Sequence, residues 1–135
     1  MPANNQDKPS VLVSRCLLGI PCRFHGKTHV RGMRIGRPGL IARLRKTCNL
    51  VDVCPEVDAG LSIPRPPTRI VDGRWICDGE DVTADFRRGA EIALALAKQH
   101  GCKKAYLLKD SPACDRDKGA AGKLLTKSGI TVIRS

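Results

Sequence analysis

Cysteine is the residue type with the most chemical potential in this sequence. The chain has an odd number of cysteines, and no two of them are spaced as C-x-x-C. That spacing argues against zinc ribbons, thioredoxin-like redox sites and ferredoxin-type cluster runs. Any metal site must therefore be assembled by the fold from distant segments. The cysteines are Cys16, Cys22, Cys48, Cys54, Cys77, Cys102 and Cys114.

Three of these cysteines follow segments that are typical of short buried strands. The segments with their cysteines are 11–14 with Cys16, 50–53 with Cys54, and 104–108 with Cys114. In an open parallel sheet, ligands bind beyond the carboxyl ends of the strands, so we expect the three thiols to converge there. Three thiolates at one place need a cation to neutralise them, and a metal centre with three protein ligands keeps one position open. The alternative is that they are small buried hydrophobic residues.

The elements that must position these thiols alternate between strand and helix. A turn at Asp72-Gly73 between β-formers also predicts a hairpin over 69–76, whereas 19–39 reads as a long loop. Thr83 is the expected N-cap of the longest helix. We expect an α/β fold with a short, mostly parallel sheet, helices on both faces in three layers, and a small β-hairpin insertion. The expected strands are 11–14, 50–53, 104–108 and 130–133, and the expected helices are 38–49, 83–100 and 118–127.

Length and composition favour one globular domain. The chain has 135 residues, of which 41% are hydrophobic and 27% charged. We assign the domain to residues 11–135 and expect a flexible polar tail over 1–10. No apolar run approaches the roughly 18 residues of a membrane span, and the polar start lacks a secretory signal. With the odd cysteine count, these features favour a reducing, cytoplasmic location over a disulfide scaffold.

The positive charge is concentrated in one part of the sequence. The formal net charge is +11, and segment 8–51 contains ten basic residues and no acidic one. Such a segment attracts anions, among them phosphates, RNA, an acidic partner or a negatively charged substrate or cluster. The alternative is a solvated basic surface. Aromatic residues make up only 3%, which argues against a single-strand binder built on stacking platforms.

Three sequence motifs together resemble one known family. They are 13–26 (VSRCLLGIPCRFHG), 54–67 (CPEVDAGLSIPRPP) and 109–114 (KDSPAC). The second motif is long and specific, and the resemblance covers nearly the whole chain from Val11. The family is the 2-thiouracil desulfurase family, formerly catalogued as domain of unknown function 523.

The resemblance implies an iron–sulfur enzyme. By motif match, Cys16, Cys54 and Cys114 would hold a [4Fe-4S] cluster, and its fourth iron would have no protein thiolate. That iron would bind the sulfur of a small thiolated compound such as a thiopyrimidine. The sulfur would leave to the cluster, and water would supply the oxygen that replaces it. The chain would then be an iron–sulfur-dependent desulfurase.

Four polar residues beside the motif cysteines are further candidates. Glu56 is the candidate base or proton shuttle, and its alternative role is a salt bridge to Arg65. Ser111 and Ser14 could hydrogen-bond the substrate or a cluster sulfur, and their alternative role is turn capping. Arg65 could contact substrate or fix its loop.

Other residues of the motifs carry weaker functional hypotheses. Cys22 could accept sulfur, but we favour a simple loop thiol, and we expect His25 and His29 to face solvent. The loop after Cys114 is shorter than the family pattern, which would leave the pocket more open. Two other functions fit the same residues. One is a non-catalytic cluster or metal module that docks RNA or another anionic partner through the basic segment. The other is a sulfur carrier that uses a cysteine persulfide.

Overall fold

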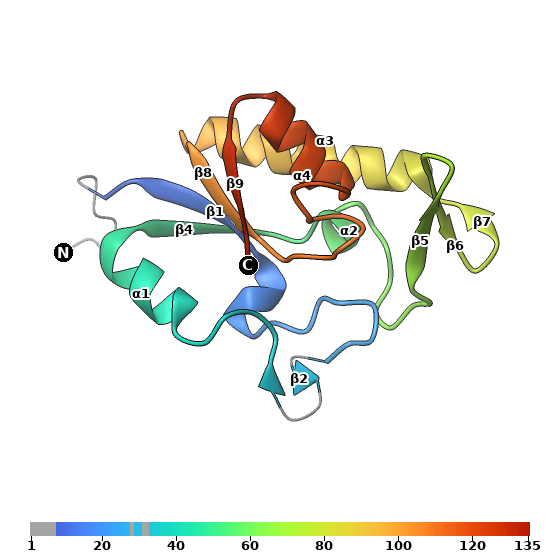
Figure 1. Ribbon diagram of the computed structural model, residues 1–135, viewed down its shortest axis with the longest axis horizontal. Coiled ribbons are helices and arrows are strands. Elements are labelled where there is room, and N and C mark those ends of the chain that lie inside the picture. The colour runs from blue at the N-terminus through green and yellow to red at the C-terminus, as the bar shows by residue number, and fades with distance from the viewer. Residues whose placement is uncertain (1–7, 28, 31–32) are drawn as a thin grey trace.

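A four-stranded parallel sheet forms the centre of the molecule. The computed structural model describes residues 8–27, 29–30 and 33–135, and the expected flexible tail lies mostly outside them. The strand order is β4-β1-β8-β9, with every neighbouring pair parallel (Figure 1). Because all four strands run the same way, their carboxyl ends share one edge of the sheet. The strands are β1 (Ser10–Ser14), β4 (Asn49–Val53), β8 (Lys104–Leu107) and β9 (Thr131–Arg134).

Helices cover both faces of this sheet. Helices α3 (Thr83–Gln99) and α4 (Ala120–Lys127) lie together on one face, and α1 (Leu40–Thr47) lies on the other (Figure 1). Side chains along β1 point alternately to the two faces. Leu12 packs in the core cluster on the α3 and α4 side, whereas Val11 and Val13 pack in a second cluster against α1. The predicted three-layer α/β architecture is therefore confirmed.

The predicted hairpin is present as part of a separate small sheet. Strands β5 (Thr68–Val71) and β6 (Arg74–Cys77) pair antiparallel, and β7 (Glu80–Asp81) adds a third strand that was not expected. Both turn residues have positive φ, 50° at Asp72 and 74° at Gly73, as a type I′ turn requires.

The start of α3 differs from the expectation that Thr83 is its N-cap. Asp81 instead accepts the Thr83 amide through Oδ1 at 2.9 Å. The Thr83 hydroxyl accepts the Trp75 amide at 2.9 Å, so it ties the hairpin to the first turn of the helix. The Thr83 hydroxyl thus binds the Trp75 amide, eight residues away, instead of capping its own helix, because the hairpin buries that amide.

The segment expected to be one long loop contains short elements. These are the antiparallel pair β2 (His29–Val30) and β3 (Met33–Arg34). A single 3-10 turn, η1 (Arg15–Leu18), lies directly before the segment. A second unexpected element is α2 (Pro55–Asp58), one turn of helix directly after β4. Elements this short contain too few residues to show a hydrophobic period. No helix among the described residues is long and apolar enough to cross a membrane.

Candidate functional site

Four thiols line one pocket at the carboxyl edge of the main sheet. Cys16 follows β1, Cys54 lies between β4 and α2, and Cys114 lies in the loop after β8, so three strands each bring one thiol. Cys22 of the loop after η1 joins them. All four residues are buried, with between 3% and 8% of their surface exposed. The pocket is also lined by Ser14, Arg15, Arg23, Glu56, Leu108 and Ser111.

An ion pair joins the turns that present the first two thiols. The Arg15 guanidinium donates to both carboxylate oxygens of Asp58, at 2.9 and 3.0 Å, and to Asp52 at 2.6 Å. Asp58 Oδ2 also accepts the Cys54 backbone amide at 3.2 Å. Burial alone would lower the pKa of Arg15, but its bonds to the two aspartates outweigh that effect and raise the pKa. The turn after β1 is therefore fixed to the turn after β4.

Two glycines let helices pack directly against the thiol-bearing loops. A side-chain carbon at Gly89 of α3 would collide with the Pro55 carbonyl, one residue after Cys54. One at Gly122 of α4 would collide with the carbonyls of Cys114 and Asp115. The backbones approach this closely only because neither glycine has a Cβ. The core helices thus hold both loops in place.

Two buried serines contact Cys114. Ser111 Oγ accepts the amides of Ala113 and Cys114 at 3.2 and 3.0 Å, and Ser14 Oγ accepts the Leu108 amide at 2.9 Å. Each hydroxyl therefore caps backbone and retains one proton to donate. The nearby hydroxyls of both serines favour the thiolate form of Cys114, although burial, the larger effect, raises its pKa. The structure thus places the serines against sulfur, on the same side as the pocket.

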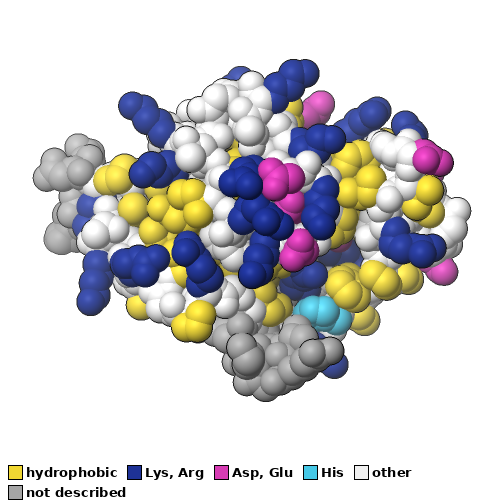
Figure 2. Space-filling view, viewed as in Figure 1, with side chains coloured by type: hydrophobic (Ala, Val, Ile, Leu, Met, Phe, Trp, Pro, Cys, Tyr) yellow, Lys and Arg dark blue, Asp and Glu magenta, His cyan; other side chains and the backbone are white. Residues whose placement is uncertain are grey.

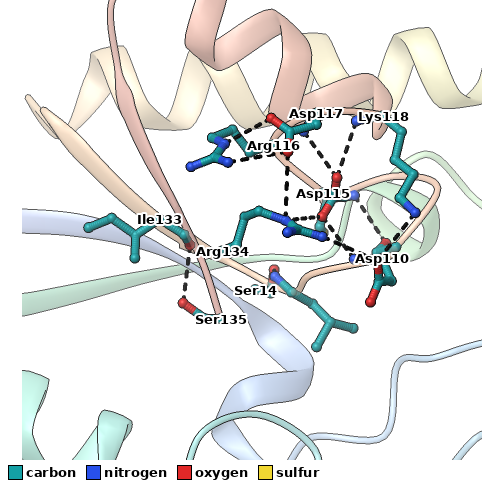
Figure 3. A network of polar contacts seen from close by, with 12 residues as sticks. Ser14, Asp110, Asp115, Arg116, Asp117, Lys118, Ile133, Arg134 and Ser135 are labelled. Carbon is teal, nitrogen blue, oxygen red and sulfur yellow. Dashed lines mark hydrogen bonds and ion pairs between the residues drawn. The ribbon is translucent and has the colours of Figure 1, made fainter.

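A carboxylate network closes the short loop after Cys114 (Figure 3). Asp115 is completely buried and accepts the amides of Asp110, Asp117 and Lys118 at 2.9, 3.0 and 3.2 Å. Arg134 of β9 donates to the same carboxylate at 2.8 Å. Burial alone would raise the pKa of Asp115, but these hydrogen bonds outweigh it and lower the pKa. The loop is short, but it is firmly held.

The thiols lack a comparable neutralising partner. Burial raises the pKa of Cys114 to about 12. A hydrogen bond with Cys16 raises the pKa of Cys22 to about 12, and a bond with Cys22 raises the pKa of Cys54. With protein groups alone, Cys22, Cys54 and Cys114 are therefore held as neutral thiols. Thiolates would form there once a cationic metal centre enters.

The donor set fits a cluster better than a single metal ion. No three His, Cys, Asp or Glu side chains among residues 8–27, 35–135 meet closely enough to hold one ion. An iron–sulfur cluster differs, because its cysteines bind different irons and stand further apart. Thiolates are the ligands such clusters take, and Arg23, which lines the pocket and forms no ion pair with a described carboxylate, offsets part of the negative charge they bring.

Glu56 and Arg65 form a buried ion pair at the pocket. Arg65 donates to Glu56 Oε1 twice, at 2.7 and 3.1 Å, and to the Ser62 carbonyl at 2.7 Å. Their side chains are 12% and 5% exposed. No described residue donates to Glu56 Oε2, so that oxygen remains available. Glu56 lines the pocket, whereas Arg65 stands behind it and orients the carboxylate.

A second, basic cleft borders the thiol pocket and shares Arg23 and Leu108 with it. The cleft has a volume of about 390 Å³ and is also lined by His25, Arg37, Lys109 and one acidic residue, Asp110. Burial, then the charges of Arg23 and Lys27, lower the pKa of His25, whose side chain is partly exposed in this cleft. The His29 side chain lies outside the described residues. Figure 2 shows Lys and Arg side chains spread over one face of the molecule.

The sequence argument named three of the four pocket thiols and missed other parts of the site. It left Cys22 as a loop residue and gave no role to Arg15, Asp58 or Asp115. A signal for Asp115 did exist, because an aspartate side chain in a turn often accepts the backbone amide two residues further along, as Asp115 does from Asp117. The remaining cysteines, Cys48, Cys77 and Cys102, do not line the pocket.

Comparison with known proteins gives three matches that span most of the chain. A sequence model of the 2-thiouracil desulfurase family matches residues 11–134. The uncharacterized protein YbbK of Bacillus subtilis (strain 168) is 33% identical over 136 residues, which cover 90% of this chain and 85% of that protein. The solved structure of the [4Fe-4S]-dependent thiouracil desulfidase TudS superposes with a TM-score of 0.81 at 36% identity. That match covers 95% of this chain and 91% of the other.

Proposed function

Because this chain belongs to the 2-thiouracil desulfurase family, we propose that it is a [4Fe-4S]-dependent desulfurase that removes sulfur from a small thiolated compound. The substrate class we favour is a thiopyrimidine, which the family description and the similar TudS structure support. One observation carries the proposal. Cys16, Cys54 and Cys114 come from three separate strand ends and line one pocket.

These three cysteines are the proposed cluster ligands. When bound there, a [4Fe-4S] cluster supplies one iron without a protein thiolate, which acts as a Lewis acid toward the sulfur of the substrate. Ser14 and Ser111 donate hydrogen bonds to the Cys114 sulfur and stabilise it as a thiolate. The Arg15–Asp58 pair keeps the Cys16 and Cys54 turns at a fixed separation.

Glu56 is the proposed proton carrier. Its Oε1 is engaged by Arg65, so Oε2 is the atom that accepts a proton from the water that replaces the sulfur. Arg65 is a positioning residue, because it holds the carboxylate from behind the pocket. Ser111 accepts two backbone amides and Ser14 accepts one, and each hydroxyl can donate its proton to the substrate or to sulfur.

The test uses anaerobically reconstituted protein and 2-thiouracil as the probe. We expect stoichiometric uracil and sulfide from the wild type and from Cys48→Ala, whose cysteine lies outside the pocket. Cys114→Ala should release neither. A cluster-loaded wild type that turns over neither 2-thiouracil nor other thiolated pyrimidines would contradict the enzyme assignment.

The basic cleft favours a second candidate function, docking of RNA or another anionic partner. Arg23, Arg37 and Lys109 line it, and no described carboxylate forms an ion pair with them. Phosphate contacts would make binding of tRNA fall steeply with salt. The double variant R37A/K109A should then bind tRNA at least tenfold more weakly. Binding without salt dependence would remove this candidate, and iron content separates both functions from a persulfide carrier, which needs no iron.

The cysteines also favour a reducing compartment. All seven are free thiols, and four of them lie together in the pocket without pairing. An oxidising compartment would link thiols this close into disulfides. We therefore propose a cytoplasmic location, which a fluorescent fusion would test.

A further inference from the structure

Trp75 of β6 joins the small sheet of β5, β6 and β7 to the core beside the first turns of α3 (Figure 1). Trp75 is buried, with 8% of its surface exposed, and its ring stacks on Phe86 of α3 with 6.2 Å between the ring centroids. Its amide donates to the Thr83 hydroxyl at 2.9 Å, and its carbonyl accepts the Val82 amide at 2.8 Å. The ring and the backbone of this one residue thus hold the hairpin against α3.

The indole of Trp75 also contacts the loop that carries Cys114. Its Nε1–H donates to the Pro112 carbonyl at 2.7 Å, two residues before Cys114 in the chain. In the part of the chain that the structure describes, no other hydrogen bond joins the small sheet to segment 109–118. The hairpin therefore reaches the loop of a proposed cluster ligand through a single polar group.

Different elements hold the chain before and after Cys114. After it, the buried carboxylate of Asp115 and its hydrogen bonds close the loop. Before it, the Pro112 carbonyl accepts both the Trp75 indole and the Ala120 amide, at 2.7 and 3.1 Å. The pyrrolidine ring fixes φ at Pro112, and the two hydrogen bonds to its carbonyl restrict ψ. The peptide plane that leads toward Cys114 is therefore held in one orientation.

Packing alone does not fix the indole relative to this loop. A cleft of about 350 Å³ lies between the hairpin, α3 and α4, and Trp75, Ala90 and Ala120 are among the residues that line it. Side chains therefore do not fill the space on that side of the ring. The hydrogen bond to Pro112 supplies the directional contact that the open packing lacks.

We propose that Trp75 is a positioning residue for the cluster site, because its indole N–H holds the Pro112 carbonyl and thereby places the Cys114 sulfur. This inference rests on the proposed function, in which Cys114 is a cluster ligand. A metal site works only when supporting contacts keep its ligands within about 0.5 Å of the productive geometry. The small sheet, to which the desulfurase proposal gives no role, supplies one of these contacts.

The test replaces the indole N–H without changing the size of the ring. Trp75 is the only tryptophan in the chain, so biosynthetic incorporation of 3-benzothienylalanine, which has sulfur in place of N–H, changes this position alone. We expect the amides of Ala113 and Cys114 to exchange hydrogen about tenfold faster, the usual effect of one lost hydrogen bond, while amides of β1 keep their rates. Incorporation of 5-fluorotryptophan, which retains the N–H, should restore wild-type exchange. Arg74→Ala, which breaks an exposed ion pair with Asp81 in the same hairpin, should also leave the loop unchanged.

The cluster provides a second measurement that a purely structural role would not change. After anaerobic reconstitution, the protein with 3-benzothienylalanine should keep its iron content, but the electron paramagnetic resonance spectrum of its reduced cluster should shift. The protein with 5-fluorotryptophan should give the wild-type spectrum. An unchanged spectrum in both proteins would overturn the inference.

A measurement on wild-type protein avoids any folding defect of the replacement. The single indole N–H gives one nuclear magnetic resonance signal in the cluster-free chain. Its protection from exchange should match that of the Cys114 amide within about threefold, because one local opening exposes both. An indole that exchanges like free tryptophan, or a replacement that speeds exchange equally over the whole chain, would overturn the inference. Absence of iron from the wild type would instead contradict the proposed function, and since the exchange measurements need no iron, the two failures are distinguishable.

Discussion

Two buried polar centres lie side by side at the carboxyl edge of the main sheet, and they differ in how their charge is satisfied. Asp115 receives three backbone amides and the Arg134 guanidinium, and these bonds lower its pKa. Its neighbour Cys114 is also buried, and burial raises its pKa to about 12. The first centre is complete within the protein. The second is complete only when something cationic enters the pocket.

This difference separates a structural polar group from a binding site. A buried charge whose hydrogen bonds are all made holds the fold and needs nothing from outside. The fold holds these buried thiols together although each neighbour disfavours the charged form of the next and so raises its pKa. Groups in that state at strand ends are typical of ligand sites. The two centres are coupled through the chain, because the Asp115 network fixes the loop that carries Cys114.

Removal of the Asp115 carboxylate is expected to have the largest effect on stability. Asp115→Ala leaves several buried amides and the Arg134 guanidinium without their acceptor. We expect the free energy of unfolding to fall by about 4 kcal/mol, the usual size for a broken buried pair. The exposed Asp117→Ala should change it by about 0.5 kcal/mol or less. Urea unfolding measures both changes. Equal effects would contradict the claim that the Asp115 network stabilises the fold.

A substitution at Glu56 tests whether the thiol pocket is a catalytic site. Glu56→Gln keeps the hydrogen-bond geometry with Arg65 but removes a proton acceptor. We expect kcat for 2-thiouracil to fall about a hundredfold, the lower range for loss of a general base. Iron content should stay at the wild-type level, and Glu80→Gln in the hairpin should retain full activity. A parallel loss of iron would show that Glu56 only supports the cluster site.

The Arg15–Asp58 pair has features of both the structural Asp115 network and the thiol pocket. It is a part-buried ion pair, and it joins two thiol-bearing turns. Arg15→Lys loses the forked contact, and Asp58→Asn loses the charge and weakens the acceptor for the Cys54 amide. Each should lower the free energy of unfolding by about 1.5 kcal/mol. In a double-mutant cycle their effects should be less than additive. Full additivity would show that the pair does not act as one unit.

The smallest expected effect is at Asp81, an exposed counterpart of Asp115. Hydrogen bonds from Thr83 and from Arg74 lower the pKa of Asp81 from 3.8 to about 2. Because the folded state holds this carboxylate in its charged form, its contribution is present above pH 4 and lost as the pH falls toward 2. The stability difference between wild type and Asp81→Asn should therefore shrink over that interval. A difference that stays constant with pH would contradict this explanation.

The convergence of three thiols at the carboxyl edge of the sheet could be predicted from the sequence, because each strand and its cysteine lie close together in the chain. Short apolar runs marked three strands, and a parallel sheet brings their ends together wherever the helices lie. The Arg15–Asp58 pair and the Asp115–Arg134 pair join residues 43 and 19 positions apart, which no local pattern indicates. The position of Cys22 in the pocket was not predicted for a related reason. A loop without a hydrophobic period gives no indication of which side of the fold it approaches.

Iron and acid-labile sulfide per chain after anaerobic reconstitution test the central claim most directly. The measurement covers wild type and single alanine variants of Cys16, Cys54, Cys114 and Cys48. We expect about four irons in wild type and in Cys48→Ala, and loss of the cluster in the other three variants. A wild type without iron, or equal loss in Cys48→Ala, would contradict the assignment of the strand-end thiols as cluster ligands.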